Sequence, residues 1–153
     1  MIEFVNFEKD LKYSLSIDGY QFPEIKSDWD GNWLMIRSEV QYKKNRFDAV
    51  DPSLVTMEFT DIVNWFDCIS NNKIPKYSNL CFTEPNLEFQ LFGNRGDVIR
   101  YGIKLDLELK PNFKIDDHDD FVMVFEHNFD QLMELKNKLR IECDAFPQRG
   151  SLY

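Results

Sequence analysis

The sequence predicts an α+β domain built on a twisted, mostly antiparallel sheet of about eight strands, as one sheet or a flattened sandwich, with two covering helices. Three observations support this fold class: a period-two alternation over residues 99–109, two apolar stripes with helical spacing, and turn residues between these segments. In residues 99–109 every second side chain is apolar, so one face of a strand about 35 Å long would be buried. A strand of that length needs a broad antiparallel sheet beside it.

The first half of the chain predicts four strands followed by a helix. The strands are expected at residues 2–7, 13–17, 33–42 and 47–55, the last interrupted near Asp51-Pro52. A basic hairpin tip at residues 43–46 separates the third strand from the fourth. The helix is expected at residues 57–70, where apolar residues recur with helical spacing after Thr56, a favoured N-cap residue.

The second half repeats this order of elements. Strands are expected at residues 80–83, 87–91, 99–109 and 121–126, with a hairpin turn at 93–96 and an acidic loop at 111–120. Residues 121–126 are apolar on both faces, which predicts a central strand. The second helix is expected to start after Asn128 and to end at Phe146-Pro147; its apolar stripe comprises Phe129, Leu132, Leu135, Leu139 and Cys143. No residue pattern recurs between the halves, and the whole of residues 1–153 is predicted to be a single domain.

The composition predicts a cytoplasmic globular protein. Hydrophobic residues make up 43% of the chain and charged residues 29%, and aromatic residues are abundant at 15%. No apolar run approaches the length of about 18 residues that would indicate a membrane span. The N-terminal residues lack the basic and apolar segments of a signal peptide.

The net charge of −9 bears on the kind of partner. A polyanion would be repelled, which argues against direct nucleic-acid binding, whereas a basic protein would be attracted and would associate faster. The alternative interpretation is that the acidity only keeps the protein in solution.

Catalytic and metal-binding patterns are not found in the sequence. The three cysteines fit no zinc pattern, and we expect buried free thiols, with Cys68 and Cys143 in helices and Cys81 in a strand. Of the two histidines, His118 is expected to be exposed and His127 to be solvated or to cap a helix. There is no nucleophile elbow, phosphate-binding loop or dinucleotide fingerprint. We therefore predict a protein that is not an enzyme, with no catalytic residues, no cofactor and no metal.

The first candidate binding residues are the four carboxylates of the densest acidic cluster, Asp116, Asp117, Asp119 and Asp120. An EF-hand calcium loop starting at Asp116 would need Gly at its sixth position and Glu at its twelfth, where the chain has Phe121 and His127. The cluster is then a solvated loop held open by charge repulsion, or a knob that docks in a basic cleft. Weak divalent-cation binding is a third interpretation.

The second candidate is Asp28-Trp29-Asp30, a tryptophan between two carboxylates in a predicted loop. Tryptophan is favoured as an anchor in protein interfaces, so this loop is an interface candidate. The competing interpretation is that Trp29 packs over the end of the sheet. Trp65 lies at the edge of the first helical stripe and is assigned to the core.

Five short stretches, spread in order over nearly the whole chain, resemble a known family. They are residues 19–23, 28–34, 56–58, 84–89 and 146–149, of which Asn-Trp-Leu and Glu-Pro-Asn-Leu are the most telling. Together they resemble the WapI family of bacterial immunity proteins. The resemblance implies a non-enzymatic cytoplasmic antitoxin that binds the C-terminal toxin domain of a large secreted polymorphic toxin, often a nuclease with a basic cleft. It implies no particular contact residues; we expect Asn32 and Asn86 to satisfy buried backbone groups where strands begin.

Neutralisation of a toxin by binding is therefore the favoured function, with the two loops above as the contact regions. A small-ligand-binding protein or enzyme is the alternative, and it would need a deep pocket between helix and sheet with converging polar groups. A calcium-dependent adaptor is a third, weaker alternative.

Overall fold

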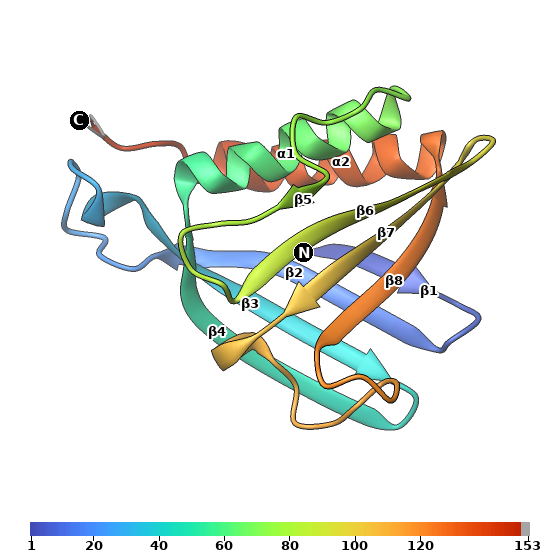
Figure 1. Cartoon of the computed structure of the whole chain (residues 1–153). Coiled ribbons are helices and arrows are strands. Elements are labelled where there is room, and N and C mark those ends of the chain that lie inside the picture. The colour runs from blue at the N-terminus through green and yellow to red at the C-terminus, as the bar shows by residue number, and fades with distance from the viewer. Residues whose placement is uncertain (151–153) are drawn as a thin grey trace.

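The computed structural model describes residues 1–150, which form two four-stranded sheets and two long helices (Figure 1). Each sheet is an antiparallel meander whose strands follow one another in chain order. The first sheet contains β1 (Ile2–Asn6), β2 (Leu11–Tyr20), β3 (Trp33–Tyr42) and β4 (Asn45–Val55), and it continues into α1 (Thr56–Ser70). The second contains β5 (Asn79–Leu80), β6 (Leu87–Arg95), β7 (Val98–Leu105) and β8 (Phe121–Asn128), followed by α2 (Phe129–Ala145). The predicted α+β class, with eight strands and two helices, is confirmed.

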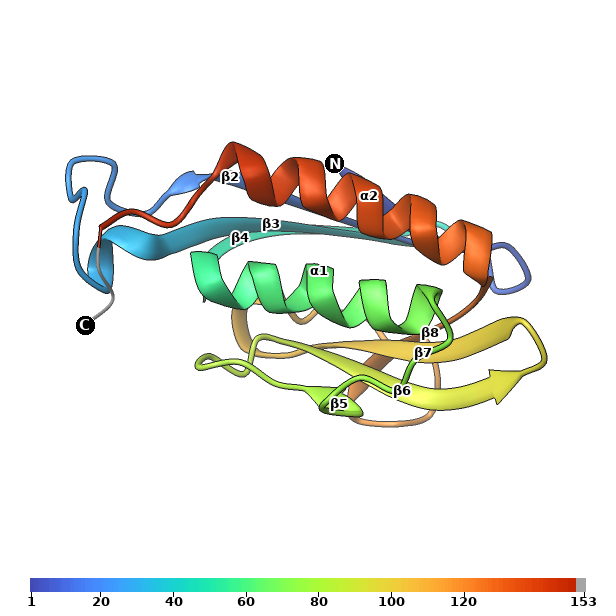
Figure 2. The same ribbon diagram turned by 90° about the horizontal axis from the view of Figure 1, so that it is seen from above.

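The helix α1 lies between the two sheets, and α2 runs alongside it (Figure 2). The apolar stripe predicted for α1 is buried, and Trp65 belongs to the core as expected. The Phe66 ring lies 5.9 Å from Phe4 of β1, 5.6 Å from Phe89 of β6 and 5.5 Å from Tyr101 of β7. One helix thus fills the space between both sheets with aromatic side chains.

The long strand predicted at residues 99–109 is four residues too long at its C-terminal end. The strand β7 ends at Leu105, and a 3-10 turn, η2 (Leu107–Leu109), follows. The Asp106 side chain accepts a hydrogen bond from the Leu107 backbone nitrogen at 2.8 Å, and Leu107 has a positive φ of 49°. The turn exposes Leu107 and buries Leu109, so these two apolar residues do not share the buried face that the alternation in the sequence predicts.

The prediction that residues 121–126 form a central strand is wrong, because β8 is the edge strand of its sheet and pairs only with β7. Its second apolar face, with Val122 and Val124, is half-buried. The Asn6 side chain of β1 donates to the Val124 carbonyl at 2.8 Å. The edges of the two sheets meet at this point, which explains why β8 is apolar on both faces.

Two local predictions also need correction, and a third is confirmed. Thr56 is the first helical residue and not the N-cap; Val55 occupies that position, and Glu58 accepts from its backbone nitrogen at 3.1 Å. Cys81 is exposed and lies outside the strands, while Cys68 and Cys143 are half-buried free thiols. The predicted N-cap of α2 is confirmed, since the Asn128 side chain accepts from the Gln131 backbone nitrogen at 2.9 Å. Over residues 1–150, neither helix is long and apolar enough to cross a membrane.

Candidate protein-binding surfaces

The acidic loop, residues 111–120, follows η2 and leads into β8. Its four aspartates are exposed, as predicted, but lysines lie close to two of them. The Asp119 carboxylate is 3.2 Å from Lys114 Nζ, and the Asp120 carboxylate is 3.8 Å from Lys104 Nζ on β7. Asp116 instead accepts a hydrogen bond from the His118 backbone nitrogen at 2.9 Å. These partners reduce the negative potential of the loop below what four aspartates alone would produce.

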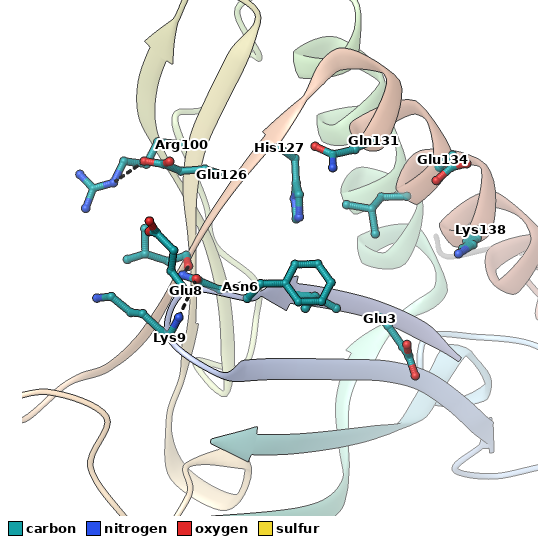
Figure 3. A pocket seen from close by; sticks show the side chains of 14 residues that line it. Glu3, Asn6, Glu8, Lys9, Arg100, Glu126, His127, Gln131, Glu134 and Lys138 are labelled. Atoms are coloured by element: carbon teal, nitrogen blue, oxygen red, sulfur yellow. Dashed lines mark hydrogen bonds and ion pairs between the residues drawn. The ribbon is translucent and has the colours of Figure 1, made fainter. Parts of the chain in front are cut away.

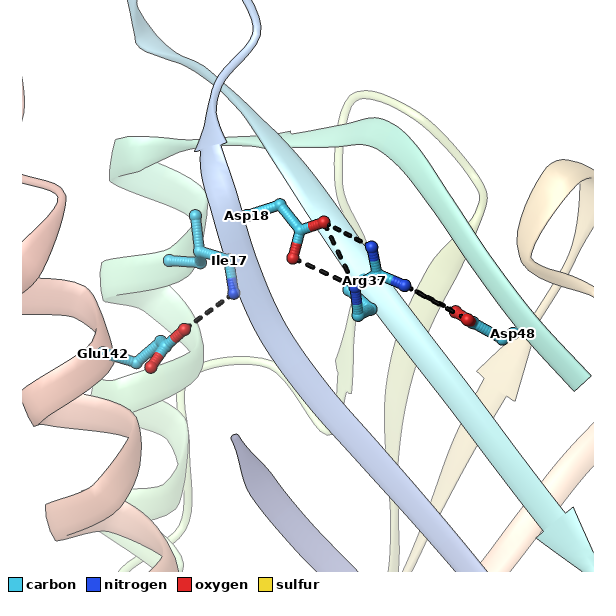
Figure 4. A network of polar contacts seen from close by, with 5 residues as sticks. All are labelled: Ile17, Asp18, Arg37, Asp48 and Glu142. Atoms are coloured by element: carbon cyan, nitrogen blue, oxygen red, sulfur yellow. Dashed lines mark hydrogen bonds and ion pairs between the residues drawn. The ribbon is translucent and has the colours of Figure 1, made fainter.

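The outer face of the first sheet carries a second set of neutralised carboxylates (Figure 4). The Arg37 guanidinium on β3 lies between Asp18 of β2, at 2.7 Å, and Asp48 of β4, at 3.0 Å. The hydrogen bonds that the Arg37 guanidinium donates to Asp18 and Asp48, together with the negative charge of these two carboxylates, raise the pKa of Arg37. Behind this face, the Glu142 side chain of α2 accepts from the Ile17 backbone nitrogen at 2.7 Å and ties the helix to β2. The carboxylates of Asp18, Asp48 and Glu142 therefore have partners within the protein, which reduces the negative charge that they present to another molecule.

The Trp29 loop, residues 21–32, connects β2 to β3 and ends in the short 3-10 turn η1 (Asp30–Asn32). Asp28, Trp29 and Asp30 are all exposed, and the Trp29 side chain packs edge-on against Trp33, with ring centroids 6.3 Å apart. The loop is tightly folded, because a Cβ atom on Gly31 would lie only 2.5 Å from the Ile25 carbonyl oxygen. Trp29 thus packs at the end of the sheet, and 37% of its surface remains exposed.

The Asn32 side chain joins the Trp29 loop to two distant parts of the chain. It is fully buried and makes four hydrogen bonds. Its amide nitrogen donates to the carbonyls of Asp28 and Arg149, at 2.8 and 2.9 Å. Its oxygen accepts from the Thr56 hydroxyl and the Arg149 backbone nitrogen, at 3.0 and 2.8 Å. The expectation that Asn32 satisfies buried backbone groups is confirmed.

Asn86 behaves differently from Asn32, although both are buried. Its amide nitrogen donates to the carboxylates of Asp51, at 3.3 Å, and Glu108, at 2.8 Å, so the expectation of backbone partners is wrong for this side chain. Burial raises the pKa of Asp51, and the nearby Glu108 carboxylate raises it further, while the Ser53 hydroxyl lowers it. The Asn86 amide therefore holds two carboxylates together where β4 approaches η2.

A groove of about 510 Å³ opens where β1, β8 and the first turns of α2 meet (Figure 3). His127 points into it and is half-buried, so it is only partly solvated, and the helix cap is the next residue, Asn128. The His127 Nδ1 lies 2.9 Å from the Tyr101 hydroxyl; burial lowers the pKa of His127, and a hydrogen bond with the Val5 backbone partly opposes that shift. With these partners, the imidazole serves to join the two sheets.

The geometry supplies little for a small-ligand pocket or a metal site. Aromatic side chains fill the space between helix and sheets, where the ligand-binding alternative would need a deep pocket. In the part of the chain that the structure describes, no three or more His, Cys, Asp or Glu side chains are grouped so that they could hold a metal ion.

A model of the immunity protein WapI-like family matches residues 5–147. The chain belongs to this family. The match includes both helices and runs from β1 to beyond α2, so both halves of the molecule are part of the WapI-like fold. No curated protein and no solved structure matches the chain.

Within this WapI-like protein, four of the five stretches that suggested the family meet around Asn32. They contribute Tyr20, Asn32, Thr56 and Arg149, which are linked by the contacts of the Asn32 side chain and by the stacking of Arg149 on Tyr20. The fifth lies next to Thr83, whose backbone nitrogen donates to Glu58 at 2.8 Å. Sequence reasoning did not identify Arg149 as part of a site; the only signal was its place in the last of the five stretches.

Proposed function

We propose that this protein binds and neutralises the C-terminal toxin domain of a cognate secreted polymorphic toxin, in the cytoplasm of the cell that produces the toxin. The observation that carries the proposal is membership of the WapI-like immunity protein family over residues 5–147. An immunity protein acts by occupying its toxin, and this role requires a stable surface and no catalytic group.

The toxin domain is proposed to be basic, as a nuclease with a phosphate-binding cleft would be. The net charge of −9 supports this choice, because opposite charges on two proteins accelerate their association and favour the correct partner. The same charge disfavours direct binding to nucleic acid. Asp116, Asp117, Asp119 and Asp120 are proposed to attract the toxin, and Asp28, Trp29 and Asp30 to contact it.

Co-expression with a toxin domain tests the proposal directly. The probe is the C-terminal domain of a long secreted protein encoded next to the gene for this chain. We expect the wild-type protein to restore growth of cells that express this domain and to co-purify with it in a one-to-one complex. A soluble, folded immunity protein that neither protects the cells nor binds the domain would refute the proposal.

A further inference from the structure

The C-terminal strap, residues 146–150, is fastened across the Trp29 loop. The Arg149 guanidinium donates to the carbonyls of Phe22 and Pro23, at 2.9 and 3.3 Å, and its carbon lies 4.0 Å from the centroid of the Tyr20 ring. The Tyr20 hydroxyl in turn donates to the Pro147 carbonyl. Figures 1 and 2 both show the segment that follows α2 running to the loop that follows β2.

The backbone of the strap also lies directly against the loop. The Asn32 side chain binds both the backbone nitrogen and the carbonyl of Arg149. A Cβ atom on Gly150, whose φ is +65°, would lie 2.8 Å from the Ser27 Cα atom. The strap therefore restrains the loop at both of its ends, near Phe22 and near Asn32, and the restraint does not depend on exposed ion pairs.

A cavity of about 350 Å³ adjoins this assembly on the side of the helices. The strap residues Phe146, Pro147 and Gln148 form one wall, and Met57 and Thr60 of α1 form part of the other. Asp144, at the end of α2, is exposed at the cavity and supplies a negative charge. The lining is mixed: Met57, Phe146 and Pro147 supply apolar surface, and Asp144 supplies a carboxylate. This combination fits the long stem and cationic head of a lysine or arginine side chain.

Most of the exposed charges on the Trp29 loop are negative. Glu24, Asp28 and Asp30 are exposed on the loop, with Lys26 as the exposed cation among them. The Arg149 guanidinium is directed at backbone carbonyls and at the Tyr20 ring. What remains accessible is an acidic surface with one exposed tryptophan, Trp29, and this combination fits a basic protein surface.

We propose that the Trp29 loop, the C-terminal strap and the adjoining cavity form one preorganised contact surface for a basic protein partner. This inference rests on the proposed function and assigns the toxin domain to this surface. Trp29 anchors the partner, the cavity receives a basic side chain beside Asp144, and Arg149 is a positioning residue that holds the loop in its binding conformation. Holding the loop before binding removes an ordering cost that the complex would otherwise bear.

The test compares Arg149→Ala with Arg95→Ala, which removes the same charge from the exposed β6–β7 hairpin. Hydrogen exchange of the free proteins comes first and needs no partner. We expect Arg149→Ala to raise the exchange rates of amides 21–31 by roughly tenfold while those of β6 and β7 stay unchanged. Arg95→Ala should leave the loop amides as they are in the wild type.

Binding to the co-expressed toxin domain is then measured for both variants and for Trp29→Ala and Asp144→Asn. We expect Arg149→Ala, Trp29→Ala and Asp144→Asn each to bind about tenfold more weakly or worse, and Arg95→Ala to bind as the wild type does. If wild type and Arg95→Ala bind and the other three bind equally well, the contact surface is refuted and the proposed function stands. If the wild type does not bind, the proposed function fails, and this inference fails with it. Unchanged loop exchange in folded Arg149→Ala would refute the positioning role.

Discussion

The acidic loop and the Trp29 loop are both exposed and both carry aspartates, but they are held in different ways. The exposed Lys114 and the half-buried Lys104 lie against two aspartates of the acidic loop, and the side chain of Asp119 is 99% exposed. The Trp29 loop is held by the fully buried Asn32 side chain and by a guanidinium that binds backbone carbonyls. Exposed ion pairs contribute little and are screened by salt, whereas breaking buried hydrogen bonds is costly.

From this difference we propose different roles in binding for the two regions. An exposed charged loop acts over a distance and would affect mainly the rate of association, while a firmly held surface with an aromatic anchor would determine how long the complex lasts. The density of charge in a sequence is therefore a guide to attraction and a poor guide to the contact surface itself.

The largest expected effect is on folding stability and concerns the Trp29 loop. Replacing Asn32 with Ala leaves the Thr56 hydroxyl, the Arg149 backbone groups and the Asp28 carbonyl without this partner. We expect the free energy of unfolding in urea to fall by about 3 kcal/mol. The exposed Asn112 of the acidic loop is the matched control, and Asn112→Ala should change the stability by less than about 0.5 kcal/mol. Equal effects of the two substitutions would remove the contrast between the loops.

The second effect concerns the affinity for the toxin domain, to which the Trp29 loop should contribute more than the acidic loop. Trp29→Ala removes the proposed anchor and should weaken binding of the toxin domain about 30-fold, mostly through faster dissociation. Trp29→Phe, which keeps an aromatic ring beside Trp33, should retain most of the affinity. Calorimetry measures the Kd of each variant, and surface plasmon resonance measures the dissociation rate. An unchanged dissociation rate in Trp29→Ala would exclude the Trp29 loop from the interface.

The third effect concerns the acidic loop and should appear in the association rate. Reversing the charges of Asp116, Asp117, Asp119 and Asp120 by replacement with Lys should slow association about fivefold at low salt. It should also flatten the dependence of the association rate on ionic strength, while the dissociation rate changes little. Stopped-flow measurements at two salt concentrations check both points, and unchanged kinetics would remove the acidic loop from the binding process.

The smallest effect concerns the pKa of Tyr20, which reports on the contact between Tyr20 and Arg149 of the strap. Burial raises the pKa of Tyr20, and the positive charge of Arg149 partly opposes this shift. The folded protein thus holds the phenolic proton more tightly than the unfolded chain, so the stabilisation is complete below the unfolded pKa of about 10 and is lost as the pH rises further. In Arg149→Ala the pKa of Tyr20 should rise, whereas Arg95→Ala should not change it. An ultraviolet titration of the tyrosines, with Tyr20→Phe to identify the signal, measures the shift.

Local patterns were enough to predict much of the fold. The alternation in β2, β3 and β7, the stripe of α1 and the Asn128 cap are properties of neighbouring residues, because a strand or helix places side chains on its faces with a fixed period. The same patterns gave wrong predictions where contacts between distant parts of the chain, and not the spacing of apolar residues, determine the structure. The strand predicted at residues 99–109 is too long, because the chain leaves the sheet after Leu105 and forms a turn. The two apolar faces of β8 predict a central strand, but β8 is an edge strand whose second face packs near the edge of the other sheet.

The candidate site was predicted only in its exposed parts. Asp28, Trp29 and Asp30 were visible as a tryptophan between carboxylates, but Arg149 is 117 residues away from Asn32 in sequence, and no local spacing indicates that pairing. The lysines beside the acidic loop were also unexpected, since Lys104 reaches Asp120 only because β7 and β8 are neighbours.

The amino-acid sequence by itself determined the elements, their order, the acidic charge and the family, because each of these is a property of composition or of residues close along the chain. The tertiary structure alone decided that the strands form two sheets, which carboxylates have cationic partners, and that residues 146–150 lie on the Trp29 loop. Those outcomes depend on which distant residues are buried next to one another. A buried amide or guanidinium without a hydrogen-bond partner costs free energy, so the fold must bring a partner to it.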